Sequence, residues 1–285
     1  MARNRRNIRR KSIKEYMNMK TFLIIVGILV AIIVVSIGIN GTRLYFDRKE
    51  IARQQEEIRQ QSEEIFSQIT DNINQANQNI SESDVLIKMS AVGDILCSQE
   101  MLDDAYNEQT KSYNFSHMFS RVSGFIDEAD IVMGTMETGI TDSKEYNSQN
   151  APIEFAQAVK NSGVNLVTIA HNHSLDNGVD GLSETQANLE ELGYSVIGSQ
   201  IETANSVEIR EVKGAKIAFL TYTCLMDNEQ SRNKEELNCV NMYSEEKALE
   251  DIEYAEENGA EYICVMIHWG DAITETVNSE QKEIA

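Results

Sequence analysis

The feature that most constrains the fold of this 285-residue chain is an alternation that begins at Val85 and runs to the last residue. Short apolar runs of strand length take turns with amphipathic stretches of helical period, which is typical of βαβ units and a mainly parallel sheet. The predicted strands cover residues 85–93, 130–136, 164–170, 194–198, 206–212, 215–223 and 261–268. The predicted helices cover residues 115–128, 153–161, 179–192 and 244–258. The sequence therefore predicts an α/β domain over residues 85–285.

Two local signals refine this pattern. Lys213-Gly214 stands between two predicted strands and indicates a hairpin. Pro152, the one proline of the chain, stands where a helix can begin.

The N-terminal region predicts a membrane anchor. Residues Phe22 to Ile39 carry no charge, and a run of about 18 residues is near the minimum for crossing a hydrocarbon core. We therefore predict a basic cytoplasmic tail over 1–20 and a transmembrane helix over 21–40. Eight Lys and Arg residues in the tail place the N-terminus in the cytoplasm and the rest of the chain outside, in a single-pass cell-membrane protein. A cleaved signal peptide ending near Gly38 is the alternative, but the apolar run is longer than a usual signal sequence.

Residues 41–84 predict a helical stalk and linker. Isoleucines recur there at helical spacing and give one narrow apolar stripe on a polar helix, at Ile51, Ile58, Ile65, Ile69, Ile73 and Ile80. Two interpretations stay open: a weak coiled coil that self-associates, and a solvated spacer helix.

The charge distribution excludes one class of partner. The net charge is −21, and the tail is basic, so the remaining chain holds 17 basic and 45 acidic residues. A body this acidic lacks the cations that displace counterions from a phosphate backbone, so we expect no nucleic-acid partner. The four cysteines form no C-x-x-C motif, and the sequence cannot pair them.

Polar side chains follow four of the predicted strands at their C-terminal ends, where open α/β sheets place ligand sites. Asp94 and Glu137 follow the first two, Asn172 and His173 follow the third, and His268 ends the last. Carboxylate, amide and imidazole groups are ligands of zinc, manganese and iron, and imidazole also transfers protons. The set has the ligand types of a dinuclear metal centre, in which two cations stabilise the attacking and leaving oxygens of an in-line displacement reaction.

Each position alone also has an ordinary explanation. The alternatives are a Gly-Asp turn, an exposed strand-end Glu, a polar surface turn at 171–177, and a core histidine beside Trp269. His117 lies inside a predicted helix and is interpreted as structural or surface. The sequence has no P-loop, no G-x-S-x-G and no G-x-G-x-x-G motif, so those classes have no support.

The motifs together resemble the CapA family, also called PgsA, of poly-γ-glutamate capsule biosynthesis proteins. The resemblance covers about residues 85–285 and rests on Gly93-Asp94, Met136-Glu137-Thr138, the run Ala170-His171-Asn172-His173-Ser174-Leu175-Asp176-Asn177-Gly178, and His268-Trp269-Gly270. It implies a metallophosphoesterase-like α/β/β/α sandwich with a two-metal site, on a membrane-anchored protein whose domain lies outside. It also implies roles: Asp94, Glu137, Asn172 and His268 at the metals, and His173 as the acid at the leaving oxygen. The implied cofactors are divalent cations, Mn, Fe or Zn.

The chain departs from the family pattern in several places. His171 stands where the family usually has Asn, Thr135 where it has another Asn, and Ala272 where a Glu is expected. Family members continue through a G-H-x-H motif and a further strand, which are absent before Ala285. We therefore expect an incomplete sandwich, a fragment or a natural truncation, with weak metal affinity.

Three functions remain in competition. The first is an accessory component of poly-γ-glutamate synthesis or export, in contact with the bilayer and with polymer synthase or export membrane subunits. The second is a metal-dependent hydrolase of phosphoesters or polymer amide bonds at the cell surface. The third is an inactive fragment.

Overall fold

The computed structural model describes residues 85–126, 128–143, 145–201, 206–272, 274 and 276–285, together with helical residues between positions 48 and 71. The chain divides into two units, Met1–Asp84 and Val85–Ala285. The predicted tail and transmembrane segment lie outside the described residues. Within the described part, no helix has the length and apolar character needed to cross a bilayer.

The described part of the predicted stalk is helical and exposed at residues 48–54, 56–57, 59–61, 63–64, 67–68 and 71. Arg53 pairs there with Glu50 at 3.2 Å and with Glu57 at 3.3 Å, one turn away on either side. Such pairs support a solvated helix by a few tenths of a kcal/mol each. Self-association of the stalk stays a prediction.

The first sheet of the Val85–Ala285 unit is four-stranded and parallel, in the order β1-β4-β7-β8. Its strands are β1 (Met89–Ile95), β4 (Ile131–Met136), β7 (Leu166–Thr168) and β8 (Ser195–Ile197). The second sheet has the order β11-β10-β9, built from β9 (Val207–Val212), β10 (Ala215–Thr223) and β11 (Tyr262–His268). All seven predicted strands are present, and no strand end differs from its predicted limit by more than four residues.

The second sheet joins a hairpin to a parallel strand. β9 and β10 are antiparallel and turn at Lys213 and Gly214, whose φ angles are 52° and 91°. Two consecutive positive φ angles match the twist of a two-residue hairpin, which confirms the predicted turn. β11 then pairs in parallel with β10 along its whole length.

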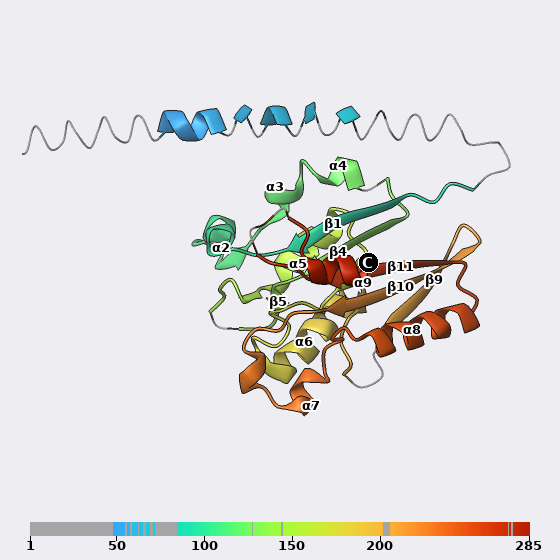
Figure 1. Ribbon diagram of the computed structural model, residues 1–285. Coiled ribbons are helices and arrows are strands. Elements are labelled where there is room, and N and C mark those ends of the chain that lie inside the picture. Colours follow the sequence, from blue (N-terminus) through green and yellow to red (C-terminus); the bar gives the residue numbers. More distant parts are fainter. Residues whose placement is uncertain are drawn as a thin grey trace, which may run out of the picture. The chain divides into compact units, whose positions relative to one another are not determined.

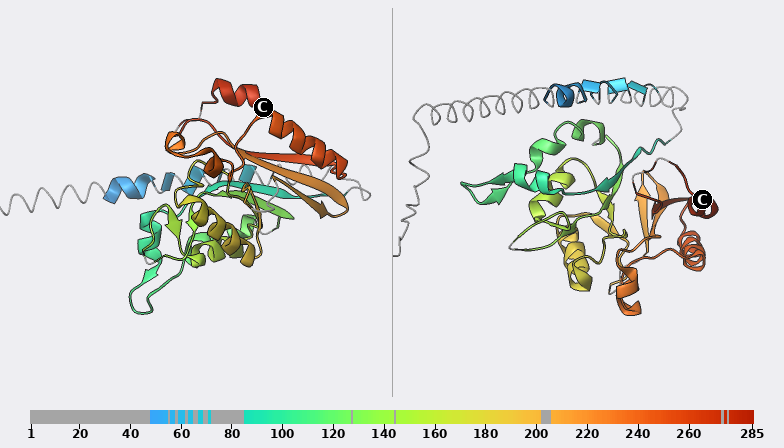
Figure 2. Two further views of the ribbon diagram at one scale, coloured as in Figure 1. Left: turned by 90° about the horizontal axis from the view of Figure 1, so that it is seen from below. Right: turned by 60° about the vertical axis from the view of Figure 1, so that its left-hand side comes forward.

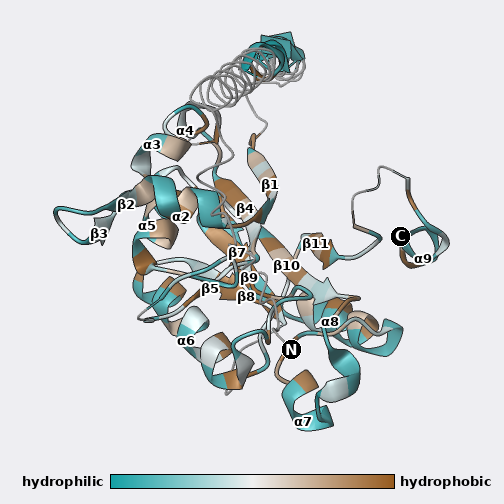
Figure 3. Cartoon of the chain, turned by 90° about the vertical axis from the view of Figure 1, so that its left-hand side faces the viewer, coloured by the Kyte–Doolittle hydropathy of each residue, from teal (hydrophilic) through white to brown (hydrophobic). Residues whose placement is uncertain are grey.

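The two sheets face each other across an apolar layer that includes Met133 and Leu166 of the first sheet and Phe219 of the second. Helices α5 (Ile153–Asn161) and α6 (Gly178–Glu191) contribute to the core on the outer side of the first sheet. Helix α8 (Glu245–Glu257) packs on the second (Figure 1). The left view of Figure 2 shows α8 (orange-red) and α6 (yellow) on opposite sides of the strands, so the layers run helix, sheet, sheet, helix. Figure 3 shows hydrophobic residues gathered in the central strands β4 and β10.

One predicted helix, 115–128, is wrong as a single element. It is replaced by two short helices, α3 (Ser116–Phe119) and α4 (Ser123–Ile126). The hydroxyl of Ser120 donates to the carbonyl of His117 at 2.8 Å, and that of Ser123 donates to the carbonyl of Ser120 at 3.4 Å. Such local bonds compete with the helical ladder and favour a break.

Pro152 precedes α5 in an extended conformation, which confirms the predicted helix start. Several short elements were not predicted: α2 (Gln99–Ala105), β2 (Tyr106–Asn107), β3 (Ser112–Tyr113), β5 (Gly139–Ile140), β6 (Asn150–Ala151), η2 (Glu229–Ser231), α7 (Lys234–Leu237) and α9 (Ser279–Ile284).

The four cysteines all lie in the described part and are free. The expectation that family members continue past residue 285 stays a prediction.

Candidate metal centre

Asp94 is delivered by a β-bulge in β1. Ala91 pairs with Met133 and Asp94 pairs with Thr135, so β1 holds one residue more than β4 between these pairs. Gly93 sits in the bulge with φ +72°, which a residue with a side chain adopts only at a cost. The sequence predicted that the strand ends at Gly93, and this limit is wrong. The strand continues to Ile95, and the bulge re-aims Asp94 without ending the pairing.

Glu137 follows the last residue of β4, a strand in which all six residues are buried. Its backbone N–H donates to the carbonyl of Ile95 at 3.0 Å, which ties it to the end of β1. The side chain is 10% exposed. Burial, helped by the negative charge of Asp94, raises the pKa of Glu137 above its usual range.

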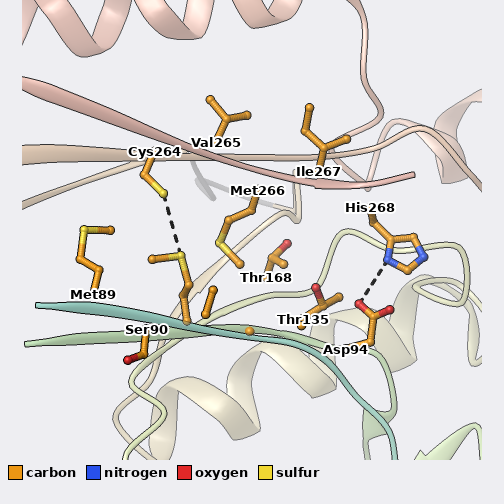
Figure 4. A pocket seen from close by; sticks show the side chains of 14 residues that line it. Met89, Ser90, Asp94, Thr135, Thr168, Cys264, Val265, Met266, Ile267 and His268 are labelled. Atoms are coloured by element: carbon orange, nitrogen blue, oxygen red, sulfur yellow. Dashed lines mark hydrogen bonds and ion pairs between the residues drawn. The ribbon is translucent and has the colours of Figure 1, made fainter. Parts of the chain in front are cut away.

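His268 ends β11 and faces Asp94 from the opposite sheet, with Nδ1 3.5 Å from the Asp94 Oδ1 (Figure 4). Asp94, Glu137 and His268 each offer a ligand atom, and these atoms lie within 4.8 Å of one another. The structure thus brings together, from both sheets, three residues that lie far apart in the sequence.

Asn172 and His173 lie in the turn after β7. The Oδ1 of Asn172 is 3.0 Å from Nε2 of His268. Both ring nitrogens of His268 therefore face oxygen acceptors. Burial by itself lowers the pKa of His268, but the carboxylates of Asp94 and Glu137 outweigh it and raise the pKa overall. The hydrogen bond that His268 donates to Asp94 is the main reason why the pKa of Asp94 is lowered.

His171 has a different role from its neighbours. It is buried, and its Nδ1 accepts from the backbone N–H of His173 at 3.2 Å. Burial lowers the pKa of His171 to about 3, so the ring is neutral at physiological pH. We interpret His171 as part of the framework that shapes the 171–177 turn. His117, by contrast, is an exposed residue that pairs with Asp104 at 2.7 Å, which confirms its surface assignment.

His173 is held by Asp176, a carboxylate that the sequence did not assign to the site. Its Nδ1 lies 2.8 Å from the Oδ2 of Asp176, and its Nε2 lies 3.9 Å from the Oε1 of Glu137. Asp176 is only 6% exposed and also accepts from Gln149 at 3.2 Å. The i, i+3 spacing of His173 and Asp176 inside one motif was the available signal.

Asp227 is the second residue that sequence reasoning missed. Its Oδ2 lies 3.4 Å from Nδ1 of His173, although 54 positions separate the two residues. It comes from the segment after β10, where no motif marked it. Only the fold could place it here.

The donor set fits a divalent cation. Two carboxylates and an imidazole, with the Asn172 amide oxygen adjacent, offer oxygen and nitrogen ligands suited to manganese, iron or zinc. Two carboxylate charges match the charge of one such ion. A cation would compete with the proton that His268 holds, because a ligating imidazole must be free of it at that nitrogen. The metal-binding and acid roles of the five predicted residues stay predictions. The structure shows that the five residues lie close to one another.

A groove of about 380 Å³ leads to the cluster. It runs between the edge strands β1 and β11, and Figure 4 shows the Asp94 and His268 side chains at one end of it. Most of its other lining is apolar, including Met89, Met133 and Met266. The cluster is therefore open to solvent along the rim of the two sheets.

Comparison with known proteins then identifies the family. The family model described as "Bacterial capsule synthesis protein PGA_cap" matches residues 88–285. The chain belongs to this family. The capsule biosynthesis protein CapA of Bacillus anthracis is 24% identical over 212 residues, which cover 70% of this chain and 50% of that protein. The PGA biosynthesis protein CapA of Bacillus subtilis is 23% identical over 220 residues, covering 71% and 54%. The chain spans about half the length of these two relatives.

Solved structures show a partial similarity of backbone. The calcineurin-like phosphoesterase YfkN of Bacillus subtilis gives a TM-score of 0.42 at 14% identity, covering 68% of this chain and 64% of that chain. The NAD nucleotidase NadN of Haemophilus influenzae gives a TM-score of 0.39 at 14% identity, covering 69% and 40%. Similarities at this level say nothing about the activity of the PGA_cap chain.

Proposed function

We propose that this PGA_cap protein takes part in the synthesis or export of capsular poly-γ-glutamate, as a membrane-anchored protein whose Val85–Ala285 unit lies outside the cytoplasm. The family membership and the names of the two Bacillus relatives support the capsule role. The uncharged run over residues 22–39, preceded by eight basic residues, supports the anchor and its orientation.

The observation that carries the role of the domain is the cluster of Asp94, Glu137 and His268 at the C-terminal ends of strands from both sheets. We assign it to a divalent cation, which would supply positive charge to an anionic group bound beside it. The rest of the surface is too acidic to attract polyglutamate directly, because like charges repel. We therefore expect the protein to meet the polymer through the cation or through partner membrane subunits.

Capsule assays in a bacterium that makes poly-γ-glutamate test this role. Deletion of the gene is expected to reduce surface polymer, and the full chain is expected to restore it when expressed with any coding sequence that follows residue 285 in the gene. The Asp94→Ala variant should not restore polymer, because the cluster loses a ligand that both supplies charge and orients His268. Full restoration by Asp94→Ala, at equal protein level, would contradict a function for the cluster.

A second function, a metal-dependent phosphoesterase or amide hydrolase, is favoured by one further observation. His173 lies beside the cluster with Nδ1 held by Asp176 at 2.8 Å, which leaves Nε2 directed toward Glu137. Asp94, Glu137 and His268 would hold the cation, which would polarise the ester or amide so that a water molecule attacks its phosphorus or carbonyl carbon. His173 would give a proton from Nε2 to the leaving oxygen or nitrogen, while Asp176 holds the ring in place.

Turnover of bis-p-nitrophenyl phosphate by the purified full chain with added Mn²⁺ tests the phosphoesterase proposal. His173→Ala should lower the rate by about 10²- to 10⁴-fold, the usual contribution of a general acid. Equal rates in the two proteins would exclude His173 as the acid. Mn²⁺ binding without turnover would favour the capsule role without phosphoester hydrolysis.

A further inference from the structure

The segment between β10 and α8 forms a loop that is pinned to the sheets at its base. Where it returns, the backbone N–H of Tyr243 donates to the carbonyl of Thr223 at 2.9 Å, and that of Thr223 donates to the carbonyl of Asn241 at 3.0 Å. The N–H of Asn241 also reaches Gly198 at 2.9 Å. A long loop whose two ends are fixed to the scaffold holds its other residues at defined positions, as functional surface loops do.

Asp227 is the residue of this loop that reaches the cation cluster. Its backbone N–H donates to the carbonyl of Asn172 at 2.9 Å, and its own carbonyl accepts from Nε of Arg232 at 3.1 Å. Its carboxylate Oδ1 accepts from Nδ2 of Asn172 at 3.0 Å. Asp227 therefore has two backbone anchors that do not depend on its side chain, and one side-chain contact with a predicted ligand.

The side-chain contact decides which way the Asn172 amide points. An amide has a donor end and an acceptor end of nearly equal shape, so its neighbours select the orientation. Asp227 can only accept, and it holds the Nδ2 end. The Oδ1 end is then directed to the opposite side, where Nε2 of His268 lies 3.0 Å away. Without the carboxylate, the amide loses the contact at its Nδ2 end, one of the two contacts that fix its oxygen beside the cluster.

We propose that Asp227 is a positioning residue of this site, which keeps the Asn172 amide oxygen turned toward His268 and the cation that the proposed function places there. It acts through Asn172. Its Oδ2, 3.4 Å from Nδ1 of His173, adds a weaker contact to a ring that Asp176 already holds at 2.8 Å.

Mn²⁺ titration of the full chain, followed by the electron paramagnetic resonance of free Mn²⁺, tests the proposal. Loss of a residue that orients a ligand usually weakens metal binding by about 10- to 100-fold, and we expect this for Asp227→Ala. Asp227→Asn should bind nearly as well as the unmodified protein, because its amide oxygen still accepts from Asn172. Glu253→Ala, which removes an exposed carboxylate from α8, is the matched control and should change nothing.

A double-variant cycle separates positioning from a general effect on the fold or the charge. In an Asn172→Ala background, Asp227→Ala should cause no further loss of affinity, because the group through which it acts is gone. Additive losses in the cycle would overturn the proposal, and so would an equal loss in Asp227→Asn and Asp227→Ala.

Failure of the protein to bind Mn²⁺ would contradict the proposed cation role. The orientation of the Asn172 amide can still be tested by a measurement that needs no metal. The side-chain ¹⁵N–¹H₂ signals of Asn172, assigned by their loss in Asn172→Asp, should shift in Asp227→Ala and stay close to their original positions in Asp227→Asn. Unchanged Asn172 signals in Asp227→Ala would overturn the proposed orientation by themselves.

Discussion

Strands β4 and β11 have similar sequences and different surroundings. Both are short apolar runs, IVMGTM and YICVMIH, and both lead to a candidate ligand. Yet all six residues of β4 are buried, whereas Tyr262 of β11 is 62% exposed and Val265 is 47% exposed. β4 lies inside its sheet, and β11 is the edge strand of the other. Hydropathy predicts a strand, but it does not tell a central strand from an edge strand.

The difference matters for the site, because the cluster combines both kinds of strand. Glu137 follows the buried strand β4, while Asp94 and His268 belong to the edge strands β1 and β11. One ligand is therefore fixed by a packed core, and two depend on strands with one free side. The histidines show the same contrast: the pKa of the buried His171 is lowered, and that of His268 at the edge is raised.

The largest expected effect tests the packing between the sheets. Phe219 of β10 is fully buried in the layer that joins them. Phe219→Ala should lower the free energy of unfolding by about 3–5 kcal/mol, because it leaves a cavity in a closed layer. Val265→Ala on the edge strand should cost far less. Denaturant unfolding of the two variants measures the contrast, and equal losses would show that the edge is as well packed as the centre.

A pH titration tests the contrast between the histidines. The folded pKa of His171 is about 3, below the unfolded value, so the unfolded chain binds a proton that the folded chain does not. Stability should therefore fall as the pH drops from about 6.5 toward 3, by a few kcal/mol at about 1.4 kcal/mol per unit of pKa shift.

His268 has the opposite sign, because its folded pKa is raised. The stability that His268 contributes is fully present below the unfolded pKa and is lost as the pH rises through the folded pKa.

The His171→Asn variant tests the acid side of the stability profile. This variant keeps one hydrogen-bond donor and one acceptor but does not titrate, so stability should fall less as the pH drops. An unchanged acid side in that variant would assign the loss to other groups.

A smaller effect is expected from a buried hydroxyl pair between the sheets. Thr221 of β10 donates to the hydroxyl of Thr168 of β7 at 2.7 Å, and Ala170 N–H donates to the same oxygen at 3.1 Å. Thr168→Val leaves both donors unpaired and should cost about 1–3 kcal/mol. Thr168→Val combined with Thr221→Val should cost less than the sum of the two single changes, since one unpaired group is then removed. Strict additivity in denaturant unfolding would show that the two hydroxyls are not coupled.

Much of the fold could be predicted because its signals are local. The seven strands follow from apolar runs, the hairpin follows from Lys213-Gly214, and the start of α5 follows from Pro152. The single helix over 115–128 failed because serine hydroxyls compete with helical hydrogen bonds, a contest that hydrophobic period does not record. The end of the first strand was placed at Gly93 because glycine with a positive φ is common in turns, whereas here that φ belongs to a bulge inside the strand.

The sequence by itself determined that carboxylate, amide and imidazole side chains lie near the C-terminal ends of four strands, in a run of strands and helices that belongs to the PGA_cap family. These side chains are those of Asp94, Glu137, Asn172, His173 and His268. Tertiary structure alone decided that β1 and β11 are edges, that His171 is buried and neutral, and that Asp227 reaches Asn172 from a loop 55 positions away. The physical reason is that strand formation depends on neighbouring residues along the chain. Burial, charge and ligand geometry depend on which distant segments the fold brings into contact.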